Sequence, residues 1–174
     1  MTGHNIIISA LCSAFLFASC VTGGDEGDPG DGNRIVVGDT VPVFTVENSE
    51  GTYVQFTKSN FTGKKTLLVF FYTKCKDCNR EKPKVQRVWD ELEDYPGFQL
   101  ITIARGEDAT TGRGFWNRAT MPCYGDMDKS AFLEFADHTV PRLYTINPQG
   151  IVTWIAIEHL DLSEEELVAK IKSL

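Results

Sequence analysis

The sequence predicts an α/β domain built on a mixed β-sheet that is flanked by helices. The chain has 174 residues, of which 42% are hydrophobic and 24% are charged, as in a globular protein with one core. From residue 35 onward, runs of β-forming residues alternate with stretches of helical periodicity, and the last two expected strands are joined by a tight turn. No internal repeat or second domain is expected.

The formal net charge of −7 limits the classes of partner. Sequence-independent binding to nucleic acid or to anionic lipid headgroups depends on clustered Lys and Arg side chains. We therefore expect no nucleic-acid partner, and membrane contact only through a lipid anchor.

The first twenty residues resemble the export signal of a lipoprotein. The apolar run from Ile6 to Ala18 is shorter than the roughly 20 residues of a membrane span, and it has the length of a signal-peptide core. It ends in "LFASC", which resembles the lipobox of bacterial lipoproteins, so we expect residues 1–19 to be a signal peptide and Cys20 to be lipidated. No basic residue precedes Arg34, and an ordinary cleaved signal or a buried N-terminal helix is the alternative.

A tether is expected between the anchor and the domain. Residues 21–33 contain five glycines and four acidic residues and almost nothing that could be buried. Such a composition is typical of a flexible, self-repelling segment. We therefore assign residues 20–34 to the lipidated cysteine and its tether, and residues 35–174 to the globular domain.

The elements of the domain follow from periodicity in chain order. Residues 41–64 predict two alternating strands turned at 49–51. Residues 65–73, "KTLLVFFYT", form a continuous apolar run that suits a strand buried on both faces. Residues 79–95 place apolar side chains on one helical face. The remaining expected elements are a strand at 98–106, a short helix at 111–119, an extended piece at 121–126, a helix at 129–138, two strands within 142–157 and a helix at 163–174 that begins with the capping box Ser163–Glu166.

Cys75 and Cys78 lie two residues apart at the expected junction of the buried strand and the helix. A structural zinc site normally needs four ligands, and the chain has no second such pair and only three histidines. A disulfide across so small a loop would stabilise the fold little, because that contribution grows with loop length. These arguments favour a redox pair.

The expected position of the pair gives each cysteine a role. A cysteine at the first turn of a helix meets unpaired backbone N–H groups and the positive end of the helix dipole, which stabilise its thiolate. We therefore predict that Cys75 is the nucleophile. Cys78, about one turn later, can attack a mixed disulfide on Cys75 and is the predicted resolving thiol. The pair itself carries the electrons, and no other cofactor or metal is expected.

Three motifs carry a resemblance that spans the domain. They are "GDTVPVFTV" at 38–46, "CKDCNREKP" at 75–83 and "TVPRLYTINPQG" at 139–150. On these motifs, residues 38–174 resemble the thioredoxin superfamily, and specifically its exported TlpA/ResA-like thiol-disulfide oxidoreductases. The resemblance implies a thioredoxin-like fold with an N-terminal β-hairpin and a central strand–helix insertion.

The resemblance also implies roles for residues outside the cysteine pair. Glu81 matches the family's glutamate that tunes the buried thiol, and we expect it to exchange a proton with Cys78. Pro83 matches the proline that kinks the active-site helix. Pro141 matches the cis-proline beside the cysteines, and the backbone at Val140 is the expected pairing edge for an extended substrate segment. Taken alone, Glu81 reads equally well as a solvated helix acid, and Pro141 could be an ordinary strand-entry proline.

The chain departs from the family at three places. Lys74 replaces the usual tryptophan, Lys76-Asp77 replaces a dipeptide that usually contains proline, and Val69 stands where cytosolic thioredoxin has a buried aspartate. These residues surround the thiolate and help to set the reduction potential. The direction of electron flow therefore stays open.

A third cysteine and two other functions are compatible with parts of the sequence. Cys123 could be a further redox thiol, but free cysteines are usually buried and we expect a core residue. A peroxiredoxin-like peroxidase would carry P-x-x-x-T-x-x-C, and neither its proline nor its threonine precedes Cys75 at that spacing. A Sco-like copper protein would use C-x-x-x-C with a histidine, for which His138 is the candidate, but the spacing here is C-x-x-C.

The sequence thus predicts a lipid-anchored thiol-disulfide oxidoreductase in the cell envelope of a Gram-negative bacterium. Its expected partners are cysteine-containing exported proteins, with maturation of apocytochrome c as the family's commonest role. A membrane thiol reductase is the implied electron donor if the pair works as a reductant in an oxidising compartment.

Overall fold

A computed structural model describes residues 31–174 as a seven-stranded mixed sheet with strand order β2-β1-β5-β4-β3-β6-β7. β3, β4 and β5 are mutually parallel, and the other neighbouring strands pair antiparallel. The elements are β1 (Phe44–Glu47), β2 (Tyr53–Phe56), η1 (Lys58–Asn60), β3 (Lys65–Phe71), α1 (Lys76–Leu92), β4 (Phe98–Arg105), α2 (Ala109–Trp116), β5 (Cys123–Asp126), α3 (Ser130–Phe135), β6 (Arg142–Ile146), β7 (Val152–Ile157) and α4 (Glu164–Lys172). The predicted fold class and order of elements are confirmed.

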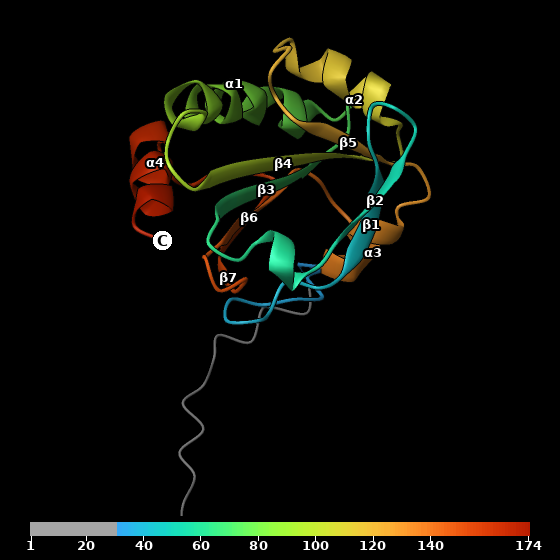
Figure 1. The fold of residues 1–174 in the computed structure, drawn as a ribbon. Coiled ribbons are helices and arrows are strands. Elements are labelled where there is room, and N and C mark those ends of the chain that lie inside the picture. The colour runs from blue at the N-terminus through green and yellow to red at the C-terminus, as the bar shows by residue number, and fades with distance from the viewer. Residues whose placement is uncertain (1–30) are drawn as a thin grey trace, which may run out of the picture.

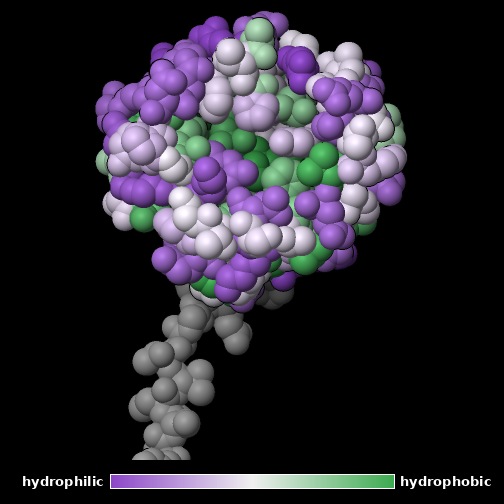
Figure 2. All heavy atoms as spheres, viewed as in Figure 1, coloured by the Kyte–Doolittle hydropathy of each residue, from purple (hydrophilic) through white to green (hydrophobic). Residues whose placement is uncertain are grey.

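Helices cover both faces of the sheet. α1 and α2 lie over one face, α4 packs beside α1, and α3 lies on the opposite side near β1 (Figure 1). Hydrophilic side chains cover most of the face viewed in Figure 2, and apolar side chains gather at its centre, over β4 and the strands beside it. Among the described residues, no helix has the length and apolar character needed to cross a membrane.

The central strand β3 is buried on both faces, as the apolar run predicted. Phe71 stacks on Phe115 of α2 with ring centroids 4.9 Å apart. Its neighbour Phe70 points to the other face, where it meets Phe132 and Phe135 of α3. Successive side chains of a strand point to opposite faces, so one apolar run supplies both halves of the core.

Several boundaries differ from the expectation, since α1 and α2 end at Leu92 and Trp116, each before the expected residue 95 or 119. α3 ends at Phe135, three residues early, because Ala136 is extended and forms a β-bridge with Asn33. Arg34, assigned to the tether, donates its backbone N–H to Phe135 O at 2.9 Å. Residues 31–34 thus lie against the domain. The signal peptide at 1–19 and lipidation of Cys20 fall outside the described residues.

The carboxyl ends of the parallel strands meet at one edge of the sheet, which positions the candidate site. Phe71 pairs with Ala104, and Arg105 pairs with Asp126, so β3, β4 and β5 end side by side. Active sites of open α/β sheets form at this edge, because the loops that follow the strands converge there.

Candidate functional site

The two cysteines begin helix α1 at the end of β3. Cys75 is the N-cap residue, with extended backbone, and its Sγ accepts a hydrogen bond from Cys78 N at 3.2 Å. A turn precedes it, in which Cys75 N donates to Tyr72 O at 3.0 Å. The sulfur of Cys75 therefore takes the place that a Ser or Asp side chain occupies at an ordinary helix N-terminus.

The two thiols have different environments. Cys75 is half-buried, whereas Cys78 is only 3% exposed. Burial, followed by a hydrogen bond with the Cys75 side chain, raises the pKa of Cys78 well above the ordinary value for a thiol. Cys75 is therefore the accessible member of the pair, and Cys78 is the protected one.

The loop before β6 supplies the opposite wall of the site. Cys75 Sγ donates a hydrogen bond to Val140 O at 3.2 Å, and the Val140–Pro141 peptide bond is cis. The structure therefore brings the predicted substrate edge into direct contact with the predicted nucleophile.

A fully buried guanidinium holds this loop in position. Arg142 donates from Nε to His138 O at 3.2 Å and to Thr139 O at 3.1 Å, and from Nη2 to His138 O at 3.0 Å. The same side chain also contacts Asp31 O and Asn33 Oδ1. Carbonyl and amide oxygens thus solvate the buried charge. The sequence analysis did not single out Arg142, whose position in an apolar strand was the only signal.

A buried carboxylate holds the turn that carries Cys75. Glu107, 9% exposed, accepts hydrogen bonds from Thr73 N at 3.0 Å and Thr73 Oγ1 at 2.5 Å. Asn79 Nδ2 donates to Thr73 O at 3.1 Å and to Cys75 O at 2.8 Å. These contacts fix both sides of the turn. The sequence analysis missed Glu107 as well.

Glu81 lies one turn beyond Cys78 and is 8% exposed. Its Oε1 is 3.1 Å from Arg80 Nε, and its Oε2 is 3.6 Å from Lys84 Nζ. His159 Nδ1, which also contacts Arg80, lies 4.0 Å from Glu81 Oε1. The reading of Glu81 as a solvated helix acid therefore does not fit the structure, because its carboxylate is covered by cations of its own helix and by the β7–α4 loop.

Three further residues named from the sequence, His138, Cys123 and Pro83, form no hydrogen bond with Cys75 or Cys78 among the described residues. His138 is exposed and contacts the Asp137 carboxylate. Within the described part of the chain, no group of three or more His, Cys, Asp or Glu side chains is arranged to hold a metal ion. Cys123 is 4% exposed and belongs to the core, as expected, and burial raises its pKa to about 12. Pro83 lies inside α1.

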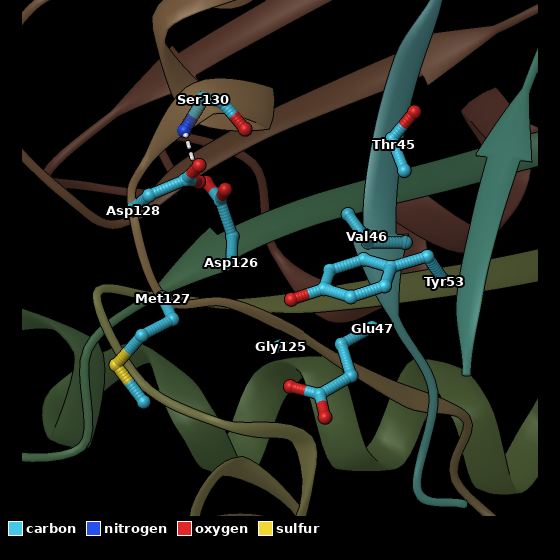
Figure 3. Close-up of a pocket in the computed structure, with 9 residues that line it drawn as sticks. All are labelled: Thr45, Val46, Glu47, Tyr53, Gly125, Asp126, Met127, Asp128 and Ser130. Atoms are coloured by element: carbon cyan, nitrogen blue, oxygen red, sulfur yellow. Dashed lines mark hydrogen bonds between the residues drawn. The ribbon is translucent and has the colours of Figure 1, made fainter. Parts of the chain in front are cut away.

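A separate hollow of about 310 Å³ lies between the β1–β2 hairpin and the end of β5. Figure 3 shows the Tyr53 hydroxyl and the Glu47 carboxylate directed into it, with Asp126 and Asp128 on its other side. Asp128 accepts a hydrogen bond from Ser130 N at 3.0 Å. The lining is acidic and contains no cysteine, so this hollow is distinct from the thiol site.

The sequence is similar to one protein family and to curated relatives of the same kind. The model of the AhpC/TSA family matches residues 37–155. The thiol-disulfide oxidoreductase ResA of Bacillus subtilis is 24% identical over 150 residues, covering 84% of this chain and 78% of the relative. ResA of Geobacillus thermodenitrificans is 26% identical over 120 residues, covering 68% of this chain and 67% of that relative.

Solved structures give the same fold. The solution structure of a proposed protein disulfide isomerase from Bacteroides thetaiotaomicron superposes with a TM-score of 0.68 at 24% identity, covering 82% of this chain and 89% of that one. The exposed lipoprotein thioredoxin of Streptococcus pneumoniae superposes with a TM-score of 0.58 at 16% identity, covering 76% of this chain and all of that one. At these identities the likeness shows a thioredoxin-like fold.

Proposed function

Since this chain belongs to the AhpC/TSA family and is a thiol-disulfide oxidoreductase with a thioredoxin-like fold, we propose that it exchanges disulfides with cysteines of exported proteins. The observation that carries the proposal is the position of Cys75. Its sulfur caps helix α1, contacts the Cys78 N–H and faces the backbone of Val140. An accessible thiol thus lies beside both its resolving thiol and an edge for substrate backbone.

The proposed reduction proceeds in two exchanges. The Cys75 thiolate attacks one sulfur of the substrate disulfide, whose S–S bond breaks, and the released substrate thiolate takes up a proton. Cys78 then loses its proton to Glu81 and attacks the Cys75 sulfur of the mixed disulfide. The second substrate thiol leaves, the substrate gains two electrons, and Cys75 and Cys78 are left as a disulfide. No other cofactor takes part, and the same steps in reverse oxidise a substrate.

The burial of Cys78 agrees with its proposed role as the resolving thiol. A buried thiol with a raised pKa is a poor nucleophile toward proteins in solution, because the thiolate is the reactive form. Glu81, buried one turn further along α1, is the proposed acceptor of its proton when the mixed disulfide forms. Attack by Cys78 is thereby restricted to a disulfide already attached to Cys75.

The proposed location is the cell envelope of a Gram-negative bacterium, with the domain anchored by lipid on Cys20. The lipobox-like "LFASC" and the acidic, glycine-rich segment behind it support this proposal, as does the fold likeness to an exposed lipoprotein. A membrane thiol reductase is the proposed electron donor, and apocytochrome c is one proposed substrate.

The test is the reduction potential of the Cys75–Cys78 couple, measured by equilibration with glutathione or dithiothreitol and read by thiol alkylation. We expect one reversible two-electron transition that is kept by Cys123→Ala and lost in Cys75→Ser. A low potential, near the roughly −270 mV of thioredoxin, would assign a reductase, and a high potential would assign an oxidase or isomerase. The absence of any reversible transition would overturn the proposed function.

A further inference from the structure

A second hollow lies at the carboxyl ends of β3 and β4, close in the chain to the cysteine pair. It has a volume of about 290 Å³ and is lined by Tyr72, Arg105, Gly106 and Lys129. Tyr72 follows β3, Arg105 ends β4, and Lys129 stands in the connection between β5 and α3. The hollow therefore lies on the same edge of the sheet as Cys75, and it brings together two cations from segments far apart in the chain.

Tyr72, which lines this hollow, is close in space to Cys75. The hydrogen bond from Cys75 N to Tyr72 O closes a β-turn, and the Cα atoms at the two ends of such a turn lie within about 7 Å. An extended chain rises about 3.3 Å per residue. A substrate segment disulfide-bonded to Cys75 therefore reaches the hollow within about two to four residues of its cysteine.

The two cations are free to bind an external anion. Neither Arg105 nor Lys129 makes an ion pair or a side-chain hydrogen bond with any residue of the range 31–174. The Arg105 guanidinium lies over the Phe132 ring, 4.5 Å from its centroid, with Nε buried and without a partner. Stacking of this kind holds the fork of an arginine in one orientation, which suits recognition of a carboxylate.

Carboxylates close to these two cations in the chain accept hydrogen bonds from other donors, among them Asp128, next to Lys129, which accepts from Ser130 N at 3.0 Å. Glu107 accepts two hydrogen bonds from Thr73. Asp126 accepts from the backbone N–H groups of Ala131 and Phe132, at 3.0 and 2.8 Å. These bonds occupy the oxygens of both Glu107 and Asp126, and neither acid forms an ion pair with Arg105 or Lys129.

The two hollows at this edge of the sheet carry opposite charge, which would orient a bound substrate segment. The neighbouring hollow, beyond Asp126, is lined by Glu47, Asp126 and Asp128 and is acidic (Figure 3). An acidic side chain of a bound segment is repelled on that side of the β5–α3 connection and attracted on the side of Arg105 and Lys129.

We propose that Arg105 and Lys129 form a specificity subsite that binds a carboxylate of the substrate, carried by an Asp or Glu within about two to four residues of its reactive cysteine. The inference rests on the proposed function, because it describes how the substrate of that reaction is selected. The overall charge of −7 would slow every acidic substrate, so a preference for acid has to come from a local site.

The test compares short peptide disulfides that differ only in one Glu or Gln, placed in turn at each position from about four residues before to about four after the cysteine. The reduced full-length protein reduces each peptide at low salt, and second-order rate constants are read by mass spectrometry. We expect one Glu position to react about fivefold faster than its Gln counterpart, as for one partly screened ion pair, and the ratio to fall toward one at high salt.

Variants assign the preference to the two cations. Arg105→Gln and Lys129→Gln are each expected to bring the Glu-to-Gln ratio close to one. Lys64→Gln removes one exposed cation at the amino end of β3, on the opposite edge of the sheet, and should keep the ratio. If loss of the Phe132 contact unfolds Arg105→Gln, Lys129→Gln alone decides.

The outcomes separate the two ideas. Equal rates for all Glu and Gln peptides, with exchange still occurring, overturn the subsite and leave the proposed function standing. A preference that survives Lys129→Gln also overturns it. Lack of exchange with every peptide overturns the proposed function, and the subsite falls with it.

Discussion

The Cys75 thiol donates a hydrogen bond of 3.2 Å to the backbone carbonyl oxygen of Val140, which lies 65 residues further along the chain. Only the protonated thiol can donate this bond, whereas the bond that Sγ accepts from Cys78 N persists in the thiolate. In the proposed mechanism, the attacking thiolate of Cys75 no longer donates to Val140 O, which leaves that oxygen free to accept from an N–H of the substrate. The proposed activation of the nucleophile would thereby also open the proposed substrate edge.

The difference in exposure predicts the order in which the thiols react. We expect iodoacetamide at neutral pH to modify Cys75 before Cys78 and Cys123 in the reduced native protein, because burial raises the pKa of the latter two. Peptide-resolved mass spectrometry measures the order, and all three should react alike in denaturant. Equal rates for Cys75 and Cys123 in the native protein would contradict this assignment.

Glu81 is expected to act in the second exchange. Glu81→Gln removes the proposed proton acceptor and should slow the attack of Cys78 by about 100-fold, the usual lower bound for general-base catalysis. Rapid-quench single turnover measures this as accumulation of the mixed disulfide on Cys75, with the first exchange little changed.

A matched control lies on the same helix. Glu91 is an exposed residue of α1 that pairs with Lys172 at 2.8 Å. Glu91→Gln should therefore leave both exchanges unaffected. Comparable slowing of both variants would assign the effect to helix charge and not to proton exchange.

Arg142 is expected to support both stability and activity. Arg142→Gln removes the buried guanidinium that donates to the carbonyls of His138 and Thr139, which should lower the free energy of unfolding by about 3 kcal/mol. The loop carrying Val140 also loses its support, so the rate of disulfide exchange should fall. Urea denaturation and peptide reduction measure the two effects.

The control replaces an arginine that donates to one carbonyl at the surface. Arg34 Nη1 donates to Leu133 O at 2.7 Å. Arg34→Gln should cost about 1 kcal/mol or less and leave exchange unchanged. A similar loss in the free energy of unfolding for both variants would mean that the burial of Arg142 adds nothing to its contribution to stability.

The sequence predicted the features that depend on neighbours along the chain. The continuous apolar run at 65–73 gave the central strand, and its alternation sends Phe70 and Phe71 to opposite faces. Ser163 and Glu166 form the predicted capping box. The redox pair was also predictable from neighbours along the chain, because two residues three positions apart lie close together at the start of a helix.

The supporting residues could not be predicted in this way. Glu107 reads as a solvated loop acid, and its function arises from contact with Thr73, 34 residues earlier. The Arg142 side chain contacts Asp31 and Asn33, which lie more than a hundred residues earlier in the chain. The pair Arg105 and Lys129 is assembled by the order of strands in the sheet, which periodicity does not determine.

The contact between Thr73 and Glu107 is expected to stabilise the turn before Cys75. Thr73→Val removes the hydroxyl donor of the 2.5 Å hydrogen bond, and Glu107→Gln weakens both acceptors. Each should lower the free energy of unfolding by about 1–3 kcal/mol, and the double variant should cost less than the sum. A double-mutant cycle in urea measures the coupling, and strict additivity would show that the contact contributes nothing by itself.

Cys123 is expected to make stability fall in alkali. Its pKa is raised by burial from 9.0 to about 12, so above pH 9 the thiol ionises in the unfolded chain before it does so in the folded one. The contribution of the neutral thiol is therefore complete below pH 9 and is lost as the pH rises toward about 12, by at most about 1.4 kcal/mol per pH unit. Cys123→Ala has no such group, so the stability difference between the wild type and this variant should shrink steadily above pH 9. Urea unfolding at several pH values measures this stability difference. The oxidised proteins are used because the Cys75–Cys78 disulfide leaves Cys78 without a titrating thiol. A difference that stays constant with pH would mean that Cys123 ionises equally in both states and that its burial is not maintained in solution.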